Sequence, residues 1–389
     1  MTRAKRRICA VTGSRADYGL LLPVLRAMQQ HPDLELCLIA TGSHLESRYG
    51  HTIDSITEDG FHVDAQIPVN LGGDDAIDIS QALAAVVGGM AEQLDRLTPD
   101  LLLVLGDRYE ILGAVQAALI ARIPVAHIAG GDVTEGAFDD PIRHAISKMS
   151  HIHFATNERA VQRLRQLGEV DDRIYLTGSP GIDLLLATPR LSTAKLESRL
   201  GMPLHARNLA ITFHPTTLQL EEAEAQLEAL LAALHELGPD TGLIFTGSNA
   251  DPKGDTLNRM VGDFVSVHSN AVQHLSLGQQ AYYSLLAACD AVVGNSSSGL
   301  YEAPSLHTPT VNIGDRQKGR LKAHSVFDCP AETEAIKAAI IRACGTDCSQ
   351  VENPYGDGMA TERIISVLAA PWRPGDLIQK RFVDRQPCN

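Results

Sequence analysis

The chain lacks the features that would mark it as disulfide-stapled, zinc-binding or membrane-spanning. Its seven cysteines are scattered over 389 residues, and no Cys-x-x-Cys pair occurs. This argues against a zinc site or a thioredoxin-like motif, and it favours reduced thiols in a cytoplasmic protein. No apolar run approaches the roughly 20 residues that a membrane span requires. The basic start at residues 1–7 is not followed by an apolar stretch, so we expect no signal peptide.

Positive charge is also scarce. There are 33 Lys and Arg residues against 47 Asp and Glu, which gives a net charge of −14. A chain this acidic is not expected to bind nucleic acid or an anionic membrane, so any bound phosphate must be held by local groups. The Walker A motif of P-loop ATPases is absent. The Gly-x-Gly-x-x-Gly fingerprint of dinucleotide-binding proteins is missing after the first expected strand.

What the sequence does contain is an alternation of short apolar runs with longer segments of helical periodicity. Strands are expected at 7–12, 34–41, 101–106, 125–129, 151–155 and 174–177, and then at 209–213, 243–246, 264–268, 291–293 and 310–313. Helices are expected at 17–30, 77–97, 109–122, 141–149, 158–167, 218–237 and 360–370. This alternation predicts βαβ units and parallel sheets, with too many strands for one sheet. We therefore predict an α/β protein of two Rossmann-like, doubly wound domains that face each other across a cleft.

The expected domains are 1–186, an N-terminal Rossmann-like domain, and 187–359, a C-terminal nucleotide-binding domain. The segment 187–207, rich in Leu and mixed charge, follows a Gly-Ser-Pro-Gly run and would form the break. A second break at 354–358 would return the chain to the first domain, on which 360–389 would pack. The ligand site of such a protein lies at the carboxyl ends of the strands.

The most informative run is 291–302, Ala-Val-Val-Gly-Asn-Ser-Ser-Ser-Gly-Leu-Tyr-Glu. Its apolar part ends at Gly294, and a helical segment is expected to open at Gly299. Backbone N–H groups and serine hydroxyls would then converge where the helix dipole favours an anion. Glu302 lies about one helical turn further on, within reach of a sugar hydroxyl. The alternative interpretation is an ordinary polar turn.

Other candidate residues also follow expected strands. Arg15 could pair with a phosphate, or it could be a surface arginine. His44 follows the second strand and could contact a sugar. Asp107 and Arg108 could supply a base and a phosphate ligand, with a local ion pair at a helix start as the alternative.

The run 127–144 is rich in carboxylates, with Asp132, Glu135, Asp139 and Asp140. A helix N-cap would explain one of them but not all four. Clustered carboxylates can shift each other's pKa values and act as acid–base groups.

In the second half, His214 and Asn249 follow expected strands and are candidates for catalysis and ligand contact. His151 and His153 alternate on one strand, and we interpret them as packed or hydrogen-bonded histidines rather than metal ligands.

Taken together, the ordered runs closely resemble the hydrolysing UDP-N-acetylglucosamine 2-epimerases of sialic-acid and related nonulosonate biosynthesis. The runs that carry the resemblance are 14–18, 42–45, 106–108, 127–131, 139–144, 214–215, 294–297, 312–317 and 355–358, together with Glu302. They are collinear and cover residues 7 to 370. Each run is weakly specific, but the ordered set is highly specific.

The resemblance implies a glycosyltransferase-B-type architecture and a nucleotide-sugar hydrolase that inverts C2 without NAD or an essential metal. UDP would leave by elimination across C1–C2, and water would then add to release N-acetylmannosamine or an analogue. Homo-oligomers, dimers or tetramers, are the family's usual state. The implied roles are acid–base work by Asp107, Asp139 and His214, nucleotide or phosphate contacts by Arg15, Arg108, His274, Ser296, Ser297 and Glu302, and sugar contacts by His44, Asn249 and Arg316.

One position departs from the family pattern. Many members carry a glutamate where this chain has Ala129. We hypothesise that Glu135 replaces it, or that the pocket accepts a different sugar. The Thr-Glu-Gly run at 134–136 resembles branches that handle 2,4-diacetamido-2,4,6-trideoxy sugars for legionaminic-type acids. A glycosyltransferase of the same fold and a non-catalytic nucleotide-sugar sensor are the rival functions.

Overall fold

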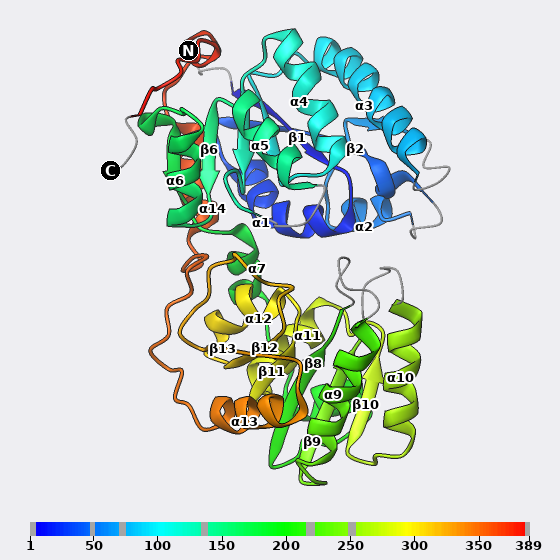
Figure 1. Ribbon diagram of the computed structural model, residues 1–389. Coiled ribbons are helices and arrows are strands. Elements are labelled where there is room, and N and C mark those ends of the chain that lie inside the picture. The colour runs from blue at the N-terminus through cyan, green and yellow to red at the C-terminus, as the bar shows by residue number, and fades with distance from the viewer. Residues whose placement is uncertain are drawn as a thin grey trace. The chain divides into compact units, whose positions relative to one another are not determined.

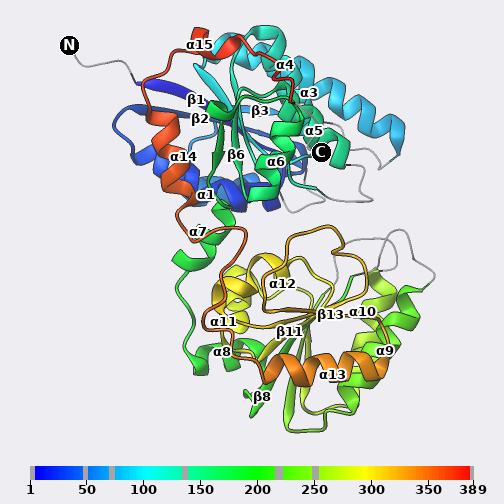
Figure 2. The ribbon, with the colours of Figure 1, turned by 60° about the vertical axis from the view of Figure 1, so that its left-hand side comes forward.

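The protein is described by a computed structural model that covers residues 5–46, 51–69, 75–133, 139–214, 222–247 and 254–385. The chain divides into two compact units, Met1–Leu184 with Tyr355–Asn389, and Leu185–Pro354. Each unit is a parallel sheet flanked by helices, as Figures 1 and 2 show. The predicted α/β class with two Rossmann-like units is therefore confirmed. Among the described residues, no helix is both long and apolar enough to cross a bilayer.

The sheet of the first unit has seven parallel strands in the order β3-β2-β1-β4-β5-β6-β7. Strand β4 is Leu-Leu-Leu-Val-Leu with every residue buried, which is typical of a central parallel strand covered on both faces. The strand order reverses between β1 and β4, so the two strand-end turns that flank this point share one edge of the sheet. The strands are β1 (Arg6–Thr12), β2 (Leu34–Thr41), β3 (Ala65–Ile67), β4 (Leu101–Leu105), β5 (Val125–Ile128), β6 (Ile152–Ala155) and β7 (Ile174–Leu176).

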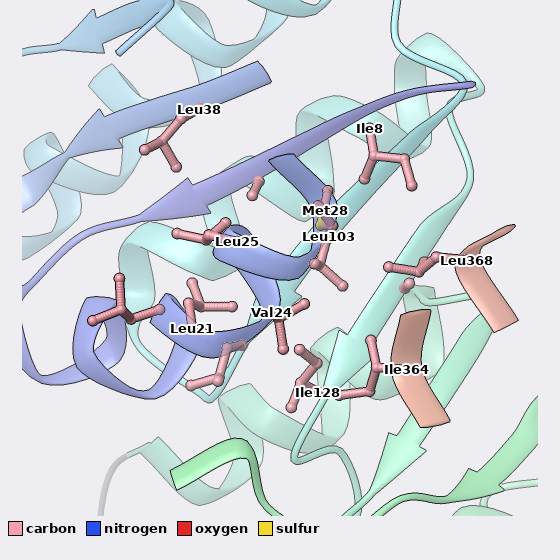
Figure 3. Packing of buried hydrophobic residues seen from close by; sticks show 14 of the residues in the cluster. Ile8, Leu21, Val24, Leu25, Met28, Leu38, Leu103, Ile128, Ile364 and Leu368 are labelled. Atoms are coloured by element: carbon pink, nitrogen blue, oxygen red, sulfur yellow. The ribbon is translucent and has the colours of Figure 1, made fainter. Parts of the chain in front are cut away.

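Helices cover both faces of this sheet. On one face, α1 and α14 pack against β1, β2, β4 and β5, and Figure 3 shows Leu21, Leu25 and Leu368 in that layer. On the other face lie α3, α4 and α5. The helices of the unit are α1 (Arg15–Gln30), η1 (Gly42–Leu45), α2 (Ile53–Glu58), α3 (Ala76–Leu97), α4 (Tyr109–Ala121), α5 (Asp139–Met149), α6 (Glu158–Gln166), η3 (Asp171–Arg173), α7 (Pro180–Ala187), α14 (Ala360–Ala369) and α15 (Pro374–Ile378).

Helix α14 returns from the second unit and is held at both ends by distant side chains. The carboxylate of Asp183 accepts hydrogen bonds from the backbone N–H groups of Ala360 and Thr361. At the other end, Arg6 donates to the carbonyls of Leu368 and Ala370, so some of the free groups at each helix terminus have partners. The C-terminal segment is thereby fixed to the first unit.

The second unit has six parallel strands in the order β10-β9-β8-β11-β12-β13. They are β8 (Arg207–Thr212), β9 (Thr241–Thr246), β10 (Ala271–His274), β11 (Ala291–Gly294), β12 (Thr310–Ile313) and β13 (Val326–Cys329). Its helices are α8 (Thr193–Leu200), α9 (Ala223–His235), α10 (Gly254–Ser266), α11 (Gln279–Ala288), α12 (Ser298–Tyr301), η4 (Ala303–Leu306) and α13 (Thr333–Cys344). Buried side chains of α9, α10 and α13 form one core layer, and those of α8 and α11 form the other.

The strand expected at 264–268 is wrong. That run forms the end of α10 and the turn after it, and the strand, β10, lies further on at Ala271–His274. The apolar residues Leu257, Val261 and Phe264 recur at helical spacing and pack on the sheet. Phe264 stacks on His268 with ring centroids 3.8 Å apart, which is the contact expected for residues four apart along a helical path. The short strands β3 and β13 were not expected from the sequence.

Candidate active site

The turn after β4 places Asp107 and Arg108 at the carboxyl end of the central strand. Arg108 donates two hydrogen bonds to Glu110, of 3.0 and 3.2 Å, and Glu110 is fully buried. The local ion pair considered as the alternative for Arg108 is therefore present. Its side chain is still 44% exposed, so the guanidinium can also meet an anion.

Glu110 connects three strand-end turns. It packs on Gly13 in the turn after β1, and a Cβ added to Gly42 would lie 2.9 Å from its Oε1. Gly42 also has a φ of +61°, which an L side chain rarely adopts. The glycine at position 42 therefore leaves the room in which Glu110 anchors Arg108, whereas a Cβ at Gly13 would meet Glu110 only at an ordinary contact distance of 3.6 Å.

Asp107 forms an ion pair with Arg143 of α5, a residue that sequence reasoning did not single out. Asp139 lies on the same helix four residues earlier. Its pKa is raised by burial and then by the charge of Asp107. The buried Nε of Arg143 and Nδ1 of His144 have no hydrogen-bond partner among the described residues. An acidic pair is thus accompanied by two buried polar atoms that a polar ligand could satisfy.

His44 is buried completely at the end of β2. Its Nε2 lies 2.9 Å from Thr12 Oγ1, and its Nδ1 lies 2.7 Å from Thr52 Oγ1. Burial lowers the pKa of His44, so the ring is neutral at physiological pH. Both ring nitrogens are occupied, which leaves neither open to a sugar in this conformation. Arg15, by contrast, is exposed at the first turn of α1.

The residues of the acidic run after β5 lie in different environments. Asp132 accepts hydrogen bonds from Thr156 and Asn157. Its burial raises its pKa, and these hydrogen bonds oppose that effect. It therefore acts as an internal anchor of the β5–α5 connection. Ala129 has a φ of +63°, a backbone conformation unusual for alanine. Glu135 lies outside the described residues.

In the second unit, His214 follows β8 and is held by Asn295 through two reciprocal hydrogen bonds. The backbone N–H of His214 donates to Asn295 Oδ1 at 2.7 Å, and Asn295 Nδ2 donates to the His214 carbonyl at 2.8 Å. Burial, and next the positive charge of Arg316, lower the pKa of His214 to about 4. The imidazole is therefore neutral at physiological pH. Arg316 also donates to the Asn295 carbonyl at 3.2 Å.

The turn after β11 requires glycine at position 294. Its φ is +135°, and a Cβ there would lie 1.9 Å from the Thr212 carbonyl oxygen. Ser296 and Ser297 follow and are partly exposed. The expected helix from Gly299 is only the single turn α12, followed by η4. An anion at this turn would depend on hydroxyl and backbone N–H groups rather than on a long helix dipole.

Glu302 lies at the junction of α12 and η4. Its Oε2 is buried and takes no hydrogen bond from any described residue. Burial raises the pKa of Glu302, and hydrogen bonding by Ser298 opposes that effect. His274, at the end of β10, lies with its Nε2 3.0 Å from the Leu200 carbonyl oxygen. Asn249 lies outside the described residues.

The structure therefore brings the predicted residues together in two groups, one per unit. The first contains Asp107, Arg108 and Asp139, and the second contains His214, Arg316, Ser296, Ser297 and Glu302. Sequence reasoning missed Arg143, Glu110 and Asn295. The spacing of Asp139 and Arg143 by four residues on an expected helix was a usable signal, since such residues share a face.

Comparisons with known proteins find relatives along nearly the whole chain. A sequence model described as UDP-N-acetylglucosamine 2-epimerase matches residues 26–369. A Campylobacter jejuni protein named GDP/UDP-N,N'-diacetylbacillosamine 2-epimerase (hydrolyzing) is 38% identical over 326 residues, 84% of each chain. A Legionella pneumophila protein named UDP-N,N'-diacetylbacillosamine 2-epimerase (hydrolyzing) is 33% identical, over 93% of this chain and 95% of that protein.

The fold is also shared with solved structures. The crystal structure of a Neisseria meningitidis UDP-GlcNAc 2-epimerase bound to UDP-GlcNAc matches with a TM-score of 0.75 at 20% identity. The match covers 93% of this chain and 99% of that one.

Proposed function

The chain belongs to the UDP-N-acetylglucosamine 2-epimerase family, and on that premise we propose that it is a hydrolysing 2-epimerase of a UDP-linked 2,4-diacetamido-2,4,6-trideoxy sugar. The choice of sugar is supported by the names of the 38% and 33% identical relatives. It also accords with Ala129, where the resemblance implies a glutamate in many members of the family. UDP-N-acetylglucosamine is the alternative substrate. The product would enter nonulosonic acid biosynthesis of the legionaminic or sialic type, in the cytoplasm.

The single structural observation that carries the activity is the carboxylate pair Asp107 and Asp139 beside Arg108 and Arg143. A hydrolysing epimerase must remove the C2 proton while the C1–O bond breaks and its electrons pass to UDP. It must then add water at C1 and return a proton to the other face of C2. Two carboxyl groups in different environments suit these opposite tasks.

We assign the base to Asp107 and the acid to Asp139. Asp107 is paired with Arg143, which positions its carboxyl group to take the C2 proton. The raised pKa of Asp139 increases its protonated fraction, so it can return a proton. Glu135 is the proposed replacement for the carboxylate missing at Ala129, and full turnover in Glu135→Gln would remove it from the mechanism.

The second unit would hold the leaving group. We propose that Ser296, Ser297 and Arg316 donate to the departing pyrophosphate as its charge grows. For Arg15 and Arg108 of the first unit we keep the predicted role of phosphate ligands. Glu302 would accept from ribose hydroxyls, and His274 would contact the nucleotide. His214 is neutral at physiological pH, so in the acid–base work it would act as a proton acceptor.

The activity is tested by incubating the protein with UDP-N,N'-diacetylbacillosamine, its GDP counterpart and UDP-N-acetylglucosamine. We expect release of UDP and a free sugar inverted at C2, followed by NMR, with the diacetamido substrate turned over faster. In heavy water the product should carry deuterium at C2, because the returned proton comes from exchangeable groups. Release of UDP with C2 unchanged would contradict the elimination route.

The same assay separates the rival functions. UDP release that requires an added acceptor would indicate a glycosyltransferase. Tight binding of every nucleotide sugar without turnover would indicate a sensor.

We also propose that the protein forms a homo-oligomer through the outer face of α3 and α4. Ile120 is 79% exposed there, and Leu119 beside it is 48% exposed. The apolar groove between the two helices is lined by Val87, Ala91 and Ala117 among others. Asp95 at the groove and the exposed Arg122 at the end of α4 are of opposite charge, so a two-fold related copy can pair them across the interface.

A further inference from the structure

The carbonyl of Gly106 belongs to the peptide bond that leads into Asp107, and a buried histidine holds it. Gly106 follows β4 directly, and its N–H still donates to the Ile128 carbonyl at 3.1 Å. Its carbonyl oxygen lies 2.7 Å from Nε2 of His127, a residue of β5 whose side chain is fully buried. Because the peptide bond is planar, the group that binds this carbonyl also fixes the direction in which the chain enters Asp107.

The protons of this contact have a defined direction. A carbonyl oxygen only accepts, so Nε2 of His127 donates to Gly106. Burial lowers the pKa of His127 to about 3, so the ring is neutral and its Nδ1 is an acceptor. Ser147 Oγ lies 3.2 Å from this Nδ1, and the serine hydroxyl therefore donates to it. His127 thus connects a side chain of α5 to the backbone of the β4–α4 turn.

Ser147 lies on the face of α5 that carries the proposed acid. Asp139, Arg143 and Ser147 follow each other at intervals of four residues, so they lie one above another along the helix. Arg143 pairs with the Asp107 carboxylate directly, whereas Ser147 reaches the peptide bond before Asp107 through His127. Helix α5 is therefore fixed to the β4–α4 turn at two points.

Two glycines permit this arrangement for different reasons. Gly106 has a φ of +82°, and no described atom lies within 4 Å of a Cβ built there, so this glycine serves the backbone conformation and not the space. A Cβ on Gly130 would lie 2.8 Å from His127 Nδ1 and 2.9 Å from Ser147 Oγ. The missing side chain at position 130 therefore leaves room for the hydrogen bond between Ser147 and His127.

We propose that Ser147 and His127 are positioning residues, which hold the Gly106–Asp107 peptide bond so that Asp107 and Asp139 keep the separation that the two proton transfers at C2 require. Neither residue needs to touch the substrate, because His127 acts through the Gly106 carbonyl and Ser147 acts through His127. The inference rests on the proposed function, to which it adds the means by which α5 and the β4–α4 turn hold the acid and the base together.

The first test compares two substitutions of His127 with UDP-N,N'-diacetylbacillosamine as substrate. The amide nitrogen of glutamine can take the place of Nε2, whereas that of asparagine reaches only as far as Nδ1. We expect His127→Asn to lower kcat by roughly 100-fold, the loss that a displacement of about 1 Å can cause, with KM little changed. His127→Gln should recover most of that loss. Equal losses of kcat in both variants, or wild-type kcat in His127→Asn, would overturn the proposal.

A milder variant keeps the test open if His127→Asn does not fold. Ser147→Ala removes the donor to Nδ1 and should lower kcat by roughly fivefold, the effect of one hydrogen bond of about 1 kcal/mol. Ser150→Ala is the matched control, because Ser150 is an equally buried serine whose hydroxyl donates to the Ile146 carbonyl instead. The same kcat in Ser147→Ala and Ser150→Ala would contradict the role of Ser147.

The second test needs no substrate and observes the Gly106 carbonyl itself. Labelling glycine with ¹³C at the carbonyl and aspartate with ¹⁵N restricts a carbonyl–amide NMR spectrum to Gly-Asp pairs, and the loss of one signal in Asp107→Asn assigns the pair at 106–107. We expect this carbonyl signal to move in His127→Asn and to stay near its wild-type position in His127→Gln and Ser150→Ala. An unmoved signal in His127→Asn would overturn the proposal. A wild type that does not turn over the sugar would contradict the proposed function, and the hydrogen-bonded link would then be judged by this signal alone.

Discussion

At the scale of single residues, Asp107 and Asp139 show how one run of sequence produces two different carboxyl groups. Asp107 is paired with Arg143, whereas Asp139 is partly buried and lies near Asp107. Burial and a neighbouring negative charge both disfavour a second charge, so the pKa of Asp139 rises. Both aspartates could be read from the sequence as candidates, but their different states depend on a contact between the β4–α4 turn and α5.

A pH–rate profile tests this difference. If Asp139 returns the proton to C2, kcat/KM should fall as pH rises through its raised pKa, because the acid must be protonated. Asp139→Asn should lower kcat by roughly 10²- to 10⁴-fold, the usual contribution of a positioned acid. Asp140→Asn is the control, since Asp140 lies beside it and faces His144 at 3.6 Å. If Asp139→Asn kept the pH–rate profile and the rate of the wild type, the acid would be a different residue.

His44 illustrates what local sequence cannot decide. Its position after a strand suggested a sugar contact, but the end of β1 and the start of α2 enclose it between Thr12 and Thr52. Three separate segments create that environment, and none of them predicts it alone. For the same reason the anchoring of Arg108 by Glu110 became visible only in the folded unit.

At the scale of elements, the C-terminal segment is fixed to the edge of the first sheet by a buried charge cluster. Glu169 accepts from Lys148 of α5 at 2.8 Å and from His153 of β6 at 3.0 Å, and it pairs with Lys380 at 2.7 Å. Burial alone would raise the pKa of Glu169, but these hydrogen bonds outweigh it and lower the pKa to about 2. The sequence placed His153 correctly as a hydrogen-bonded histidine, while the convergence of both lysines was not predictable.

This cluster predicts an acid-sensitive contribution to stability. A carboxyl group whose pKa is depressed in the folded state stabilises the protein fully above its unfolded pKa and loses that effect as pH falls toward the folded value. For Glu169 the loss should occur between about pH 4.5 and about pH 2. Glu169→Gln should therefore cost up to about 3 kcal/mol of unfolding free energy at pH 7, and much less near pH 2, in urea titrations. An equal cost at both pH values would contradict this linkage.

At the scale of the whole molecule, the outer face of α3 and α4 is the surface through which we propose that copies of this chain associate. Isolated exposed apolar residues are normal, but Ile120 and Leu119 adjoin an apolar groove on the same face. Burying such a side chain at an interface contributes about 1.5–3 kcal/mol. The face therefore offers both a protruding side chain and a groove to receive it.

We expect light scattering after size exclusion to give an oligomer for the wild type and a smaller species for Ile120→Asp. A charge at that position would have to be desolvated in the interface, which is unfavourable. Val267→Asp is the control, because Val267 is 76% exposed and belongs to the second unit rather than to α3 or α4. A wild-type monomer, or an unchanged oligomer in Ile120→Asp, would contradict the proposed interface.

The sequence by itself determined the class, the number of parallel-sheet units and the strand ends that carry polar residues. It could do so because alternating apolar periods, glycine turns and ordered motifs are properties of local chain segments. The segment 264–268 shows the limit, since a short apolar run fits a strand or the end of a helix equally well. Only the tertiary structure decided that it ends α10, that Arg143 meets Asp107, and that Asn295 holds His214. These depend on segments far apart in sequence, whose meeting is fixed by packing and not by local preference.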